Sequence, residues 1–399
     1  MLFSNKMGLL VDHLIHRLSL VIPDTPVRPI SPSVPGGQKL PSDPVAGNLM
    51  QLIATILTRL AKNNPTTKCS EASIERMSSS GDAFVNRGND FISYVISVGV
   101  IDKLRQFFSS VRGPIDDDKE AAEFLQQSLG LLIAMTKFMS KRNTNLFDKK
   151  KADDPSQLIT TFEVTELVGI VTLLYGMLLH SGASIRGEAA PPDLPANTLT
   201  ITITGLRMLN HMATLDLNML QKSLGEEGIW LEFRHIASYL MWYCSHRANE
   251  ELLHEVILCV GNFTVLNPDN QVIIQSGQPP TILQQLCVLP FEYFSDPKLT
   301  NILFPTLIDC CYSNKLNREI LEQELSCALL SNFIEEKILE AQQQGLSPTP
   351  GSGVAGKKSK NQTDKLTTVP DNDSRMNLSY RFPQEQWSTA QSYFEEEVL

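Results

Sequence analysis

The sequence lacks a continuous, uncharged apolar run of eighteen residues, so it predicts no membrane-spanning helix. Its opening stretch, 1–22, is apolar, but Asp12, Arg17 and two histidines interrupt it, and it fits neither a secretory signal nor a membrane span. Aromatic residues are scarce at 7%, and leucine, isoleucine, valine and alanine supply most of the apolar mass. This composition favours a helical protein over a β-sandwich or barrel.

Common motifs of catalysis and metal binding are also missing. The sequence contains no G-x-S-x-G, no H-E-x-x-H, no C-x-x-C and no phosphate-binding G-x-x-x-x-G-K-[ST]. Its seven cysteines lie mostly in apolar runs, as free thiols do in a reducing compartment such as the cytoplasm. We therefore expect no metal, no cofactor and no enzymatic activity. The alternative is an enzyme whose site is dispersed over helices without a motif.

Positive charge is in deficit, with 34 Lys and Arg against 44 Asp and Glu and a formal net charge of -10. Such a chain repels phosphate backbones, which disfavours nucleic acid as a partner. An RNA-binding helical-repeat protein remains an alternative, and it would need a basic concave face. Two basic runs, 149–151 and 357–360, are typical of solvated loops, with a nuclear signal or a phosphate contact as the other interpretations.

Apolar residues recur at intervals of three and four along most of the chain, which is the period of one helical face. The stretch 198–204 alternates like a strand, but its flanks are helical, so we interpret it as the start of a helix. The predicted helices are 1–22, 44–62, 88–110, 119–142, 155–181, 197–222, 226–245, 249–266, 269–289, 296–313 and 316–343.

Composition divides the chain into five parts. An N-terminal helix, 1–22, is followed by a proline-rich tether, 23–45, because seven prolines from Pro23 to Pro44 remove too many backbone donors for a packed element. A helical repeat domain is predicted at 46–343 and a disordered linker, rich in small and polar residues, at 344–377. The last part, 378–399, is predicted to be a short aromatic helix that docks either on its own chain or on a partner.

Three stretches repeat an apolar helix, a polar turn with asparagine and a second apolar helix. Aligning Asn218, Asn270 and Asn317 gives separations of 52 and 47 residues, close to the roughly 40–47 residues of armadillo or HEAT units. Two weaker units begin at 48 and 128. Because such units cover their apolar faces only by stacking, the predicted fold is all-α: an armadillo/HEAT-like α-solenoid of four to five irregular repeats with disordered linkers.

The segment CVGNFTVLNPDNQVIIQSG, from Cys259, resembles an armadillo repeat. The resemblance implies an inner-helix asparagine, here Asn262, whose amide clamps the main chain of an extended peptide. The five aligned polar positions, our candidate partner-binding residues, are Arg59, Lys137, Asn210, Asn262 and Asp309. The alternative is that these side chains cap or bridge neighbouring helices.

Residues 255–334, with GNFTVLNPDNQVIIQSG and LFPTLIDCCYSNKLNREILEQELSC, resemble the C-terminal region of the S-phase cyclin A-associated proteins of the endoplasmic reticulum. The RFPQEQW stretch near the end of the chain supports the same resemblance. The resemblance implies a cytoplasmic scaffold, at the cytosolic face of the endoplasmic reticulum, that binds a cyclin A/kinase complex. It also implies an adaptor role in co-translational decay of tubulin mRNA, through a tetratricopeptide-repeat protein and a deadenylase complex. Members of that family are longer, so we expect this chain to be a fragment, a short isoform or the product of an incomplete gene model.

Overall fold

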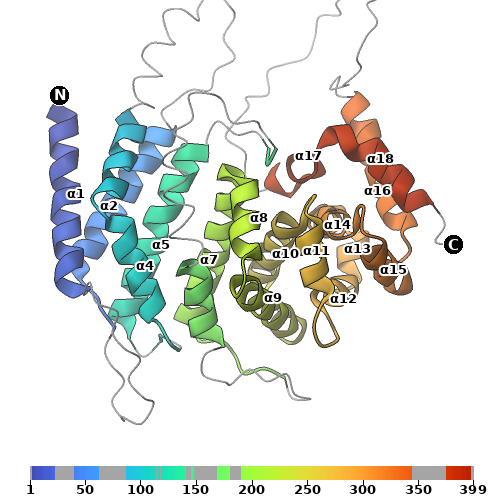
Figure 1. The fold of residues 1–399 in the computed structure, drawn as a ribbon, viewed down its shortest axis with the longest axis horizontal. Helices are drawn as coiled ribbons and strands as arrows, with labels where there is room; N and C mark the ends of the chain where they lie inside the picture. Colours follow the sequence, from blue (N-terminus) through green and yellow to red (C-terminus); the bar gives the residue numbers. More distant parts are fainter. Residues whose placement is uncertain are drawn as a thin grey trace, which may run out of the picture. The chain divides into compact units, whose positions relative to one another are not determined.

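A computed structural model gives the architecture of most of the chain (Figure 1). It describes residues 2–22, 40–62, 87–113, 115–116, 118–140, 145–147, 169–179, 190–343 and 374–396. Regular secondary structure within these ranges is entirely helical, which confirms the all-α prediction. The stretch 198–204 is helical as well, as expected.

Several sequence predictions concern residues outside the described ranges. They are most of the tether (23–39), most of the linker (344–373), the first part of the helix expected at 155–181, and both basic runs. Within the described ranges, no helix is both long enough and apolar enough to span a bilayer.

The chain divides into two compact units, Met1–Cys259 and Val260–Leu399, and the division falls within helix α10 (Glu250–Thr264). The other helices of the first unit are α1 (Leu2–Val21), α2 (Pro44–Lys62), 87–97, α4 (Val100–Ser110), α5 (Lys119–Met139), 169–178, α7 (Ala196–Leu215), α8 (Leu217–Gly225) and α9 (Ile229–His246).

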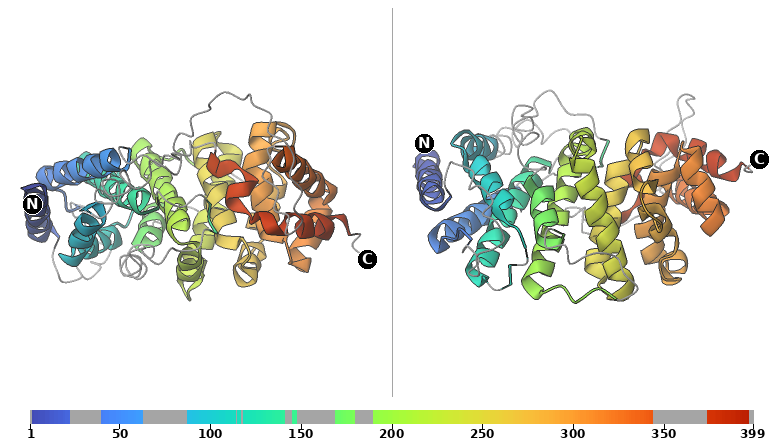
Figure 2. Two further views of the ribbon diagram at one scale, coloured as in Figure 1. Left: turned by 90° about the horizontal axis from the view of Figure 1, so that it is seen from above. Right: turned by 60° about the horizontal axis from the view of Figure 1, so that its bottom comes forward.

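Helices of the first unit pack mainly on helices that are near them in the chain (Figure 2). Helix α1 contacts α2 and α4, α2 packs along α5, and α5 packs along α7. The buried face of α2 carries Met50, Ile53 and Leu57 at the spacing of helical turns, so its apolar stripe faces its neighbours. The start of α2 is fixed by Asp43, which accepts two hydrogen bonds from Arg17, at 2.7 and 2.8 Å.

Two predicted helices of the first unit are each divided in two. The segment predicted at 88–110 breaks at Gly99, whose φ of 84° lies in the left-handed region that glycine tolerates. The segment predicted at 197–222 breaks at Asp216, whose carboxylate accepts a hydrogen bond from the Met219 amide at 3.1 Å. Each break has a local cause, a glycine or an N-capping side chain, that interrupts an otherwise continuous apolar pattern.

Helix α7 receives its N-terminal cap from a distant part of the chain. Its own N-cap position holds Pro195, which supplies no side-chain acceptor. Asp116 instead accepts from the amides of Asn197, at 2.7 Å, and Thr198, at 3.2 Å, and from the Thr198 hydroxyl at 2.6 Å. A carboxylate at this position satisfies free amides and complements the positive end of the helix dipole.

The second unit is built around α14 (Pro297–Cys311), which contacts most of the other helices of the unit. These are α11 (Pro268–Gln275), α12 (Ile282–Cys287), α13 (Glu292–Ser295), α15 (Lys315–Glu324) and α16 (Ala328–Gln343). The helix predicted at 269–289 is split because Thr281 forms a capping box with Gln284 and starts α12 anew. The helix predicted at 316–343 is likewise split, between α15 and α16.

Residues 374–396, which we call the C-terminal segment, complete the second unit. They form η3 (Ser374–Met376), α17 (Leu378–Arg381), η4 (Gln384–Gln386) and α18 (Trp387–Glu395). Helical structure therefore begins inside the linker predicted at 344–377, and the predicted single helix at 378–399 is interrupted. Pro383 explains the interruption, because proline has no amide hydrogen and cannot continue α17.

Candidate partner-binding surface

The second unit contains the same hydrogen-bonding turn twice, 47 residues apart. In the first copy, Asn267 caps α11, and the Asn270 amide nitrogen donates to the Phe263 carbonyl at 2.9 Å. In the second copy, Asn314 caps α15, and the Asn317 amide nitrogen donates to the Cys310 carbonyl at 2.7 Å. The two predicted turn asparagines, Asn270 and Asn317, thus have the same structural role.

The third aligned asparagine, Asn218, does not share this role. Its side chain is exposed, and the N-cap of α8 is Asp216. In the two copies above, the matching asparagine lies three residues after the cap, whereas Asn218 lies only two residues after Asp216. The register predicted for this stretch is therefore wrong by one residue at the turn, because the connection between α7 and α8 is shorter.

Main-chain carbonyls between helices of the second unit are joined by amide side chains. Asn317 also donates to the Gln271 carbonyl at 3.0 Å. The Gln271 side chain donates in turn to the carbonyls of Asp309, at 2.8 Å, and Tyr312, at 3.1 Å. Because these groups are largely buried, each amide satisfies a carbonyl that water does not reach, and α11 is tied to the end of α14 and the start of α15.

The five candidate residues lie in different environments. Arg59, on α2, and Lys137, on α5, are exposed. Asn210, on α7, Asn262, on α10, and Asp309, on α14, are buried, with 5%, 6% and 1% of their surface accessible. The first three belong to the first unit and the last two to the second.

Asn210 bridges two helices of the first unit. Its amide nitrogen donates to the Glu255 carbonyl at 3.1 Å and to the Glu255 carboxylate at 2.9 Å. The same carboxylate accepts from Arg207 at 2.7 Å, and Arg207 also pairs with Glu251. This arrangement matches the alternative in which the polar position joins neighbouring helices.

Asp309 lies beneath the C-terminal segment. Arg381, from α17, is as buried as Asp309, at 1% exposure, and its nitrogen Nη2 lies 3.7 Å from Asp309 Oδ2. The Arg381 guanidinium donates to the Ile302 carbonyl at 2.8 Å and to the Thr306 hydroxyl. We call the pocket formed by Gly261, Ile302, Thr306 and Asp309 the arginine pocket.

Gly261 provides the space that the arginine occupies. A Cβ atom at this position would lie 2.9 Å from both Asp309 Oδ2 and Thr306 Oγ1, and it would collide with Nη2 of Arg381. Any other residue at 261 would therefore force the guanidinium to move. The glycine directly precedes Asn262, so the predicted peptide-clamping residue is the chain neighbour of a residue that admits a side chain of the C-terminal segment.

Electrostatics in the arginine pocket are dominated by burial. Burial raises the pKa of the Asp309 carboxyl well above its ordinary value, although the Arg381 charge opposes this shift. Burial also lowers the pKa of Arg381. Neither carboxylate oxygen of Asp309 accepts a hydrogen bond, and Nε of Arg381 has no acceptor. The pair is thus desolvated and only partly compensated, which is energetically unfavourable for ionised groups.

Aromatic side chains hold the rest of the C-terminal segment. The Tyr312 ring meets the Phe382 ring edge-on at 5.3 Å and the Tyr393 ring at 5.7 Å. The Arg318 guanidinium lies 4.9 Å from the centre of the Tyr393 ring. Trp387, which lies in the segment predicted to be an aromatic helix, is buried and donates from its indole to the Phe382 carbonyl at 3.2 Å. The first predicted alternative, docking on the chain itself, is what the structure shows.

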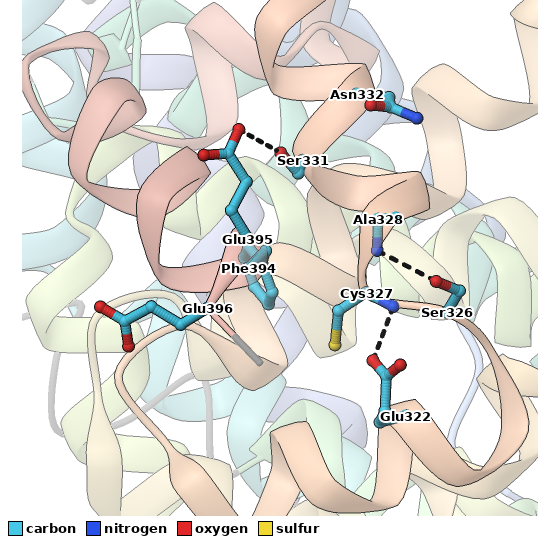
Figure 3. A pocket seen from close by; sticks show the side chains of 9 residues that line it. All are labelled: Glu322, Ser326, Cys327, Ala328, Ser331, Asn332, Phe394, Glu395 and Glu396. Atoms are coloured by element: carbon cyan, nitrogen blue, oxygen red, sulfur yellow. Dashed lines mark hydrogen bonds between the residues drawn. The ribbon is translucent and has the colours of Figure 1, made fainter. Parts of the chain in front are cut away.

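A partly open pocket of about 500 Å³ lies where the end of α18 meets the start of α16 (Figure 3). Ser331 donates to the Glu395 carboxylate at 3.0 Å on one side, and the Cys327 amide donates to Glu322 at 2.8 Å on the other. Burial raises the pKa of the Cys327 thiol to about 12, so the thiol stays protonated and is a poor nucleophile. Among the described residues, no group of three or more His, Cys, Asp and Glu side chains could hold a metal ion.

Comparison with known proteins identifies a human relative of this chain. No model of a protein family matches the chain. The human protein named S phase cyclin A-associated protein in the endoplasmic reticulum is 40% identical to it over 404 aligned residues. The chain is a homologue of this human protein. The match covers 98% of the chain but only 28% of the human relative. Its predicted placement near the carboxyl end of that relative stays a prediction.

Proposed function

We propose that this chain is a non-enzymatic protein-binding scaffold, and that its helices stack as an armadillo-like solenoid of four to five irregular units. The repeated turn of Asn267–Asn270 and Asn314–Asn317 supports such units, since identical caps 47 residues apart orient successive helix pairs in the same way. Neighbour-to-neighbour packing in the first unit supports stacking.

The single observation that carries the binding proposal is the capture of the C-terminal segment. A stretch of short, interrupted helices is held on α14–α16 by a buried arginine, a partly buried cation–π contact and several aromatic rings. These are the contact types that dominate protein–peptide recognition. The net charge of -10 favours protein ligands over RNA.

Cyclin A is the first partner to test, because the human relative is named for its association with cyclin A. The endoplasmic reticulum in that name makes its cytosolic face the first location to test. The finer roles that the resemblance implies, as an adaptor for a tetratricopeptide-repeat protein and a deadenylase complex in tubulin mRNA decay, are part of the same proposal. The chain spans 28% of the relative, so each of these partners needs its own test.

The test measures binding of the purified full chain to a purified cyclin A–kinase complex by biolayer interferometry. We expect Asn262→Ala to weaken binding about tenfold, the effect of one lost amide hydrogen bond to a peptide main chain. Asn218→Ala, at an exposed asparagine, is the matched control and should bind as the wild type does. Equal affinity for all three proteins would remove the clamp role of Asn262, and no binding by the wild type would remove cyclin A as a direct partner.

A further inference from the structure

The arginine pocket is shaped for a guanidinium group. It offers a main-chain carbonyl, a hydroxyl and a carboxylate to one guanidinium, and the absence of a side chain at Gly261 leaves room for that group. Arginine presents five donors in a planar fork that can reach several such acceptors at once. A lysine ammonium could not occupy the same plane and contact the same set.

With Arg381 bound, several polar groups of this pocket still lack hydrogen-bond partners. Its separation from Asp309 Oδ2, 3.7 Å, is longer than a hydrogen bond, and both Asp309 oxygens and Nε of Arg381 lack hydrogen-bond partners. An arginine that approached the carboxylate at hydrogen-bond distance would satisfy groups that Arg381 does not. The site therefore has unused binding capacity for a better-placed guanidinium.

We propose that the arginine pocket is a binding site for partner segments in which an arginine is followed directly by an aromatic residue, and that the C-terminal segment is its built-in competitor. The Arg381-Phe382 pair is the resident example of that chemistry. This inference rests on the proposed scaffold function and names the class of ligand, but it does not depend on cyclin A.

The competitor acts within one chain. Thirty residues, 344–373, separate the end of α16 from the C-terminal segment, so this segment faces the pocket at an effective concentration on the order of millimolar. A partner segment must therefore bind the pocket more strongly than this tethered segment does. Replacing Arg381 should weaken the tethered competitor. A long connection also favours closure on the same chain over exchange between two copies.

The experiment uses the full 399-residue chain and a fluorescein-labelled synthetic peptide with the sequence of residues 374–396, followed by fluorescence anisotropy. We expect weak binding to the wild type, where the pocket is filled, and at least tenfold tighter binding to Arg381→Ala, where the competitor is weakened. A second peptide that carries the same Arg381→Ala substitution should not show this gain. Glu385→Ala, at an exposed residue of the C-terminal segment, is the matched control and should behave as the wild type does.

A second chain variant separates release of the segment from recognition of the arginine. In Gly261→Ala the added methyl group closes the pocket, so amides of the C-terminal segment should exchange faster with deuterium while the peptide gains no affinity. If Arg381→Ala does not fold, as judged by circular dichroism, Arg381→Lys keeps the charge but loses the planar fork, and it should still give a measurable gain.

Three results would overturn the inference. Equal affinity of the peptide for the wild type and the Arg381 variants would show that Arg381 does not compete. Equal binding of both peptides to Arg381→Ala would show that the arginine is not recognised. A wild-type dimer that dissociates on Arg381→Ala would show that the ligand is a second copy of the chain. If the peptides behave as expected but the chain does not bind cyclin A, only cyclin A as a partner is removed, and the inference about the arginine pocket stands.

Discussion

Each of the two units contains a buried carboxylate near an arginine, but the two carboxylates differ in their hydrogen bonds. In the first unit, Glu255 accepts hydrogen bonds from Arg207 and Asn210, and Arg207 remains partly exposed. In the second unit, Asp309 and Arg381 are both fully buried, lie 3.7 Å apart, and leave both oxygens of Asp309 without a hydrogen bond. Both oxygens of Glu255 thus have hydrogen-bond partners, whereas neither oxygen of Asp309 has one.

The difference separates a structural bridge from a site whose occupant can change. A buried carboxylate with hydrogen bonds to both oxygens and a partly exposed arginine partner joins α7 to α10 at a lower desolvation cost. A buried pair with poor geometry adds little stability, yet loss of one partner leaves an isolated charge in the interior. Asn210 and Asp309 are equivalent positions in the predicted repeat, but only Asp309 lies against the C-terminal segment.

The largest expected effect comes from Asp309→Ala. It leaves the Arg381 guanidinium buried without a carboxylate, and arginine cannot lose its proton, so we expect the docked segment to be destabilised by about 3–5 kcal/mol. Hydrogen–deuterium exchange of residues 374–396 and urea unfolding measure this loss. Glu385→Ala should leave both unchanged; unaltered exchange in Asp309→Ala would contradict the importance we give to the buried pair.

A smaller loss is expected from Asn317→Ala, which leaves the carbonyls of Cys310 and Gln271 without their amide donor. Two buried carbonyls without donors should cost about 2–3 kcal/mol in the free energy of unfolding. The matched control is Asn218→Ala, which should change it by less than about 0.5 kcal/mol. Similar losses at Asn317 and Asn218 would restore the equivalence that the sequence alignment proposed.

The smallest effect should come from Arg207→Ala. Because Arg207 is partly exposed and Asn210 still donates to Glu255, we expect a loss of about 1 kcal/mol in the free energy of unfolding. The loss should shrink as salt rises from 50 mM to 0.5 M, since exposed ion pairs are screened. A loss as large as that of Asp309→Ala would break the contrast between the two carboxylates.

Much of the helical fold could be predicted because its signals are local. Apolar spacing gives α2 at its observed bounds, Pro44–Lys62, and asparagine caps such as Asn314 lie at the predicted turns. The breaks at Gly99 and Asp216 were missed because helical apolar spacing continues through both positions, although glycine and aspartate are the residue types that mark such breaks. The apolar spacing, which is the stronger signal, thus hides the breaks that these two residues mark.

The candidate site was only partly predictable. The repeat register predicts Asp309 as a site residue, but nothing local predicts Arg381, because 72 positions separate the two and no pattern connects them. Docking of the aromatic segment 378–399 is one of the two predicted alternatives, and its Trp387 and Phe394 are buried. The RFPQEQW sequence contains a signal, since arginine and tryptophan are enriched among the residues that dominate binding energy.

Gly261 links two properties of the chain at one position, the helix propensity of α10 and the docking of Arg381. Glycine within a helix has a helix propensity about 1 kcal/mol less favourable than that of alanine, so propensity alone would favour alanine at this position of α10. The same single methyl group would close the slot beside Asp309. Because that methyl group would also displace the buried Arg381 guanidinium, higher helix propensity and retention of the docked arginine are opposed at this one codon.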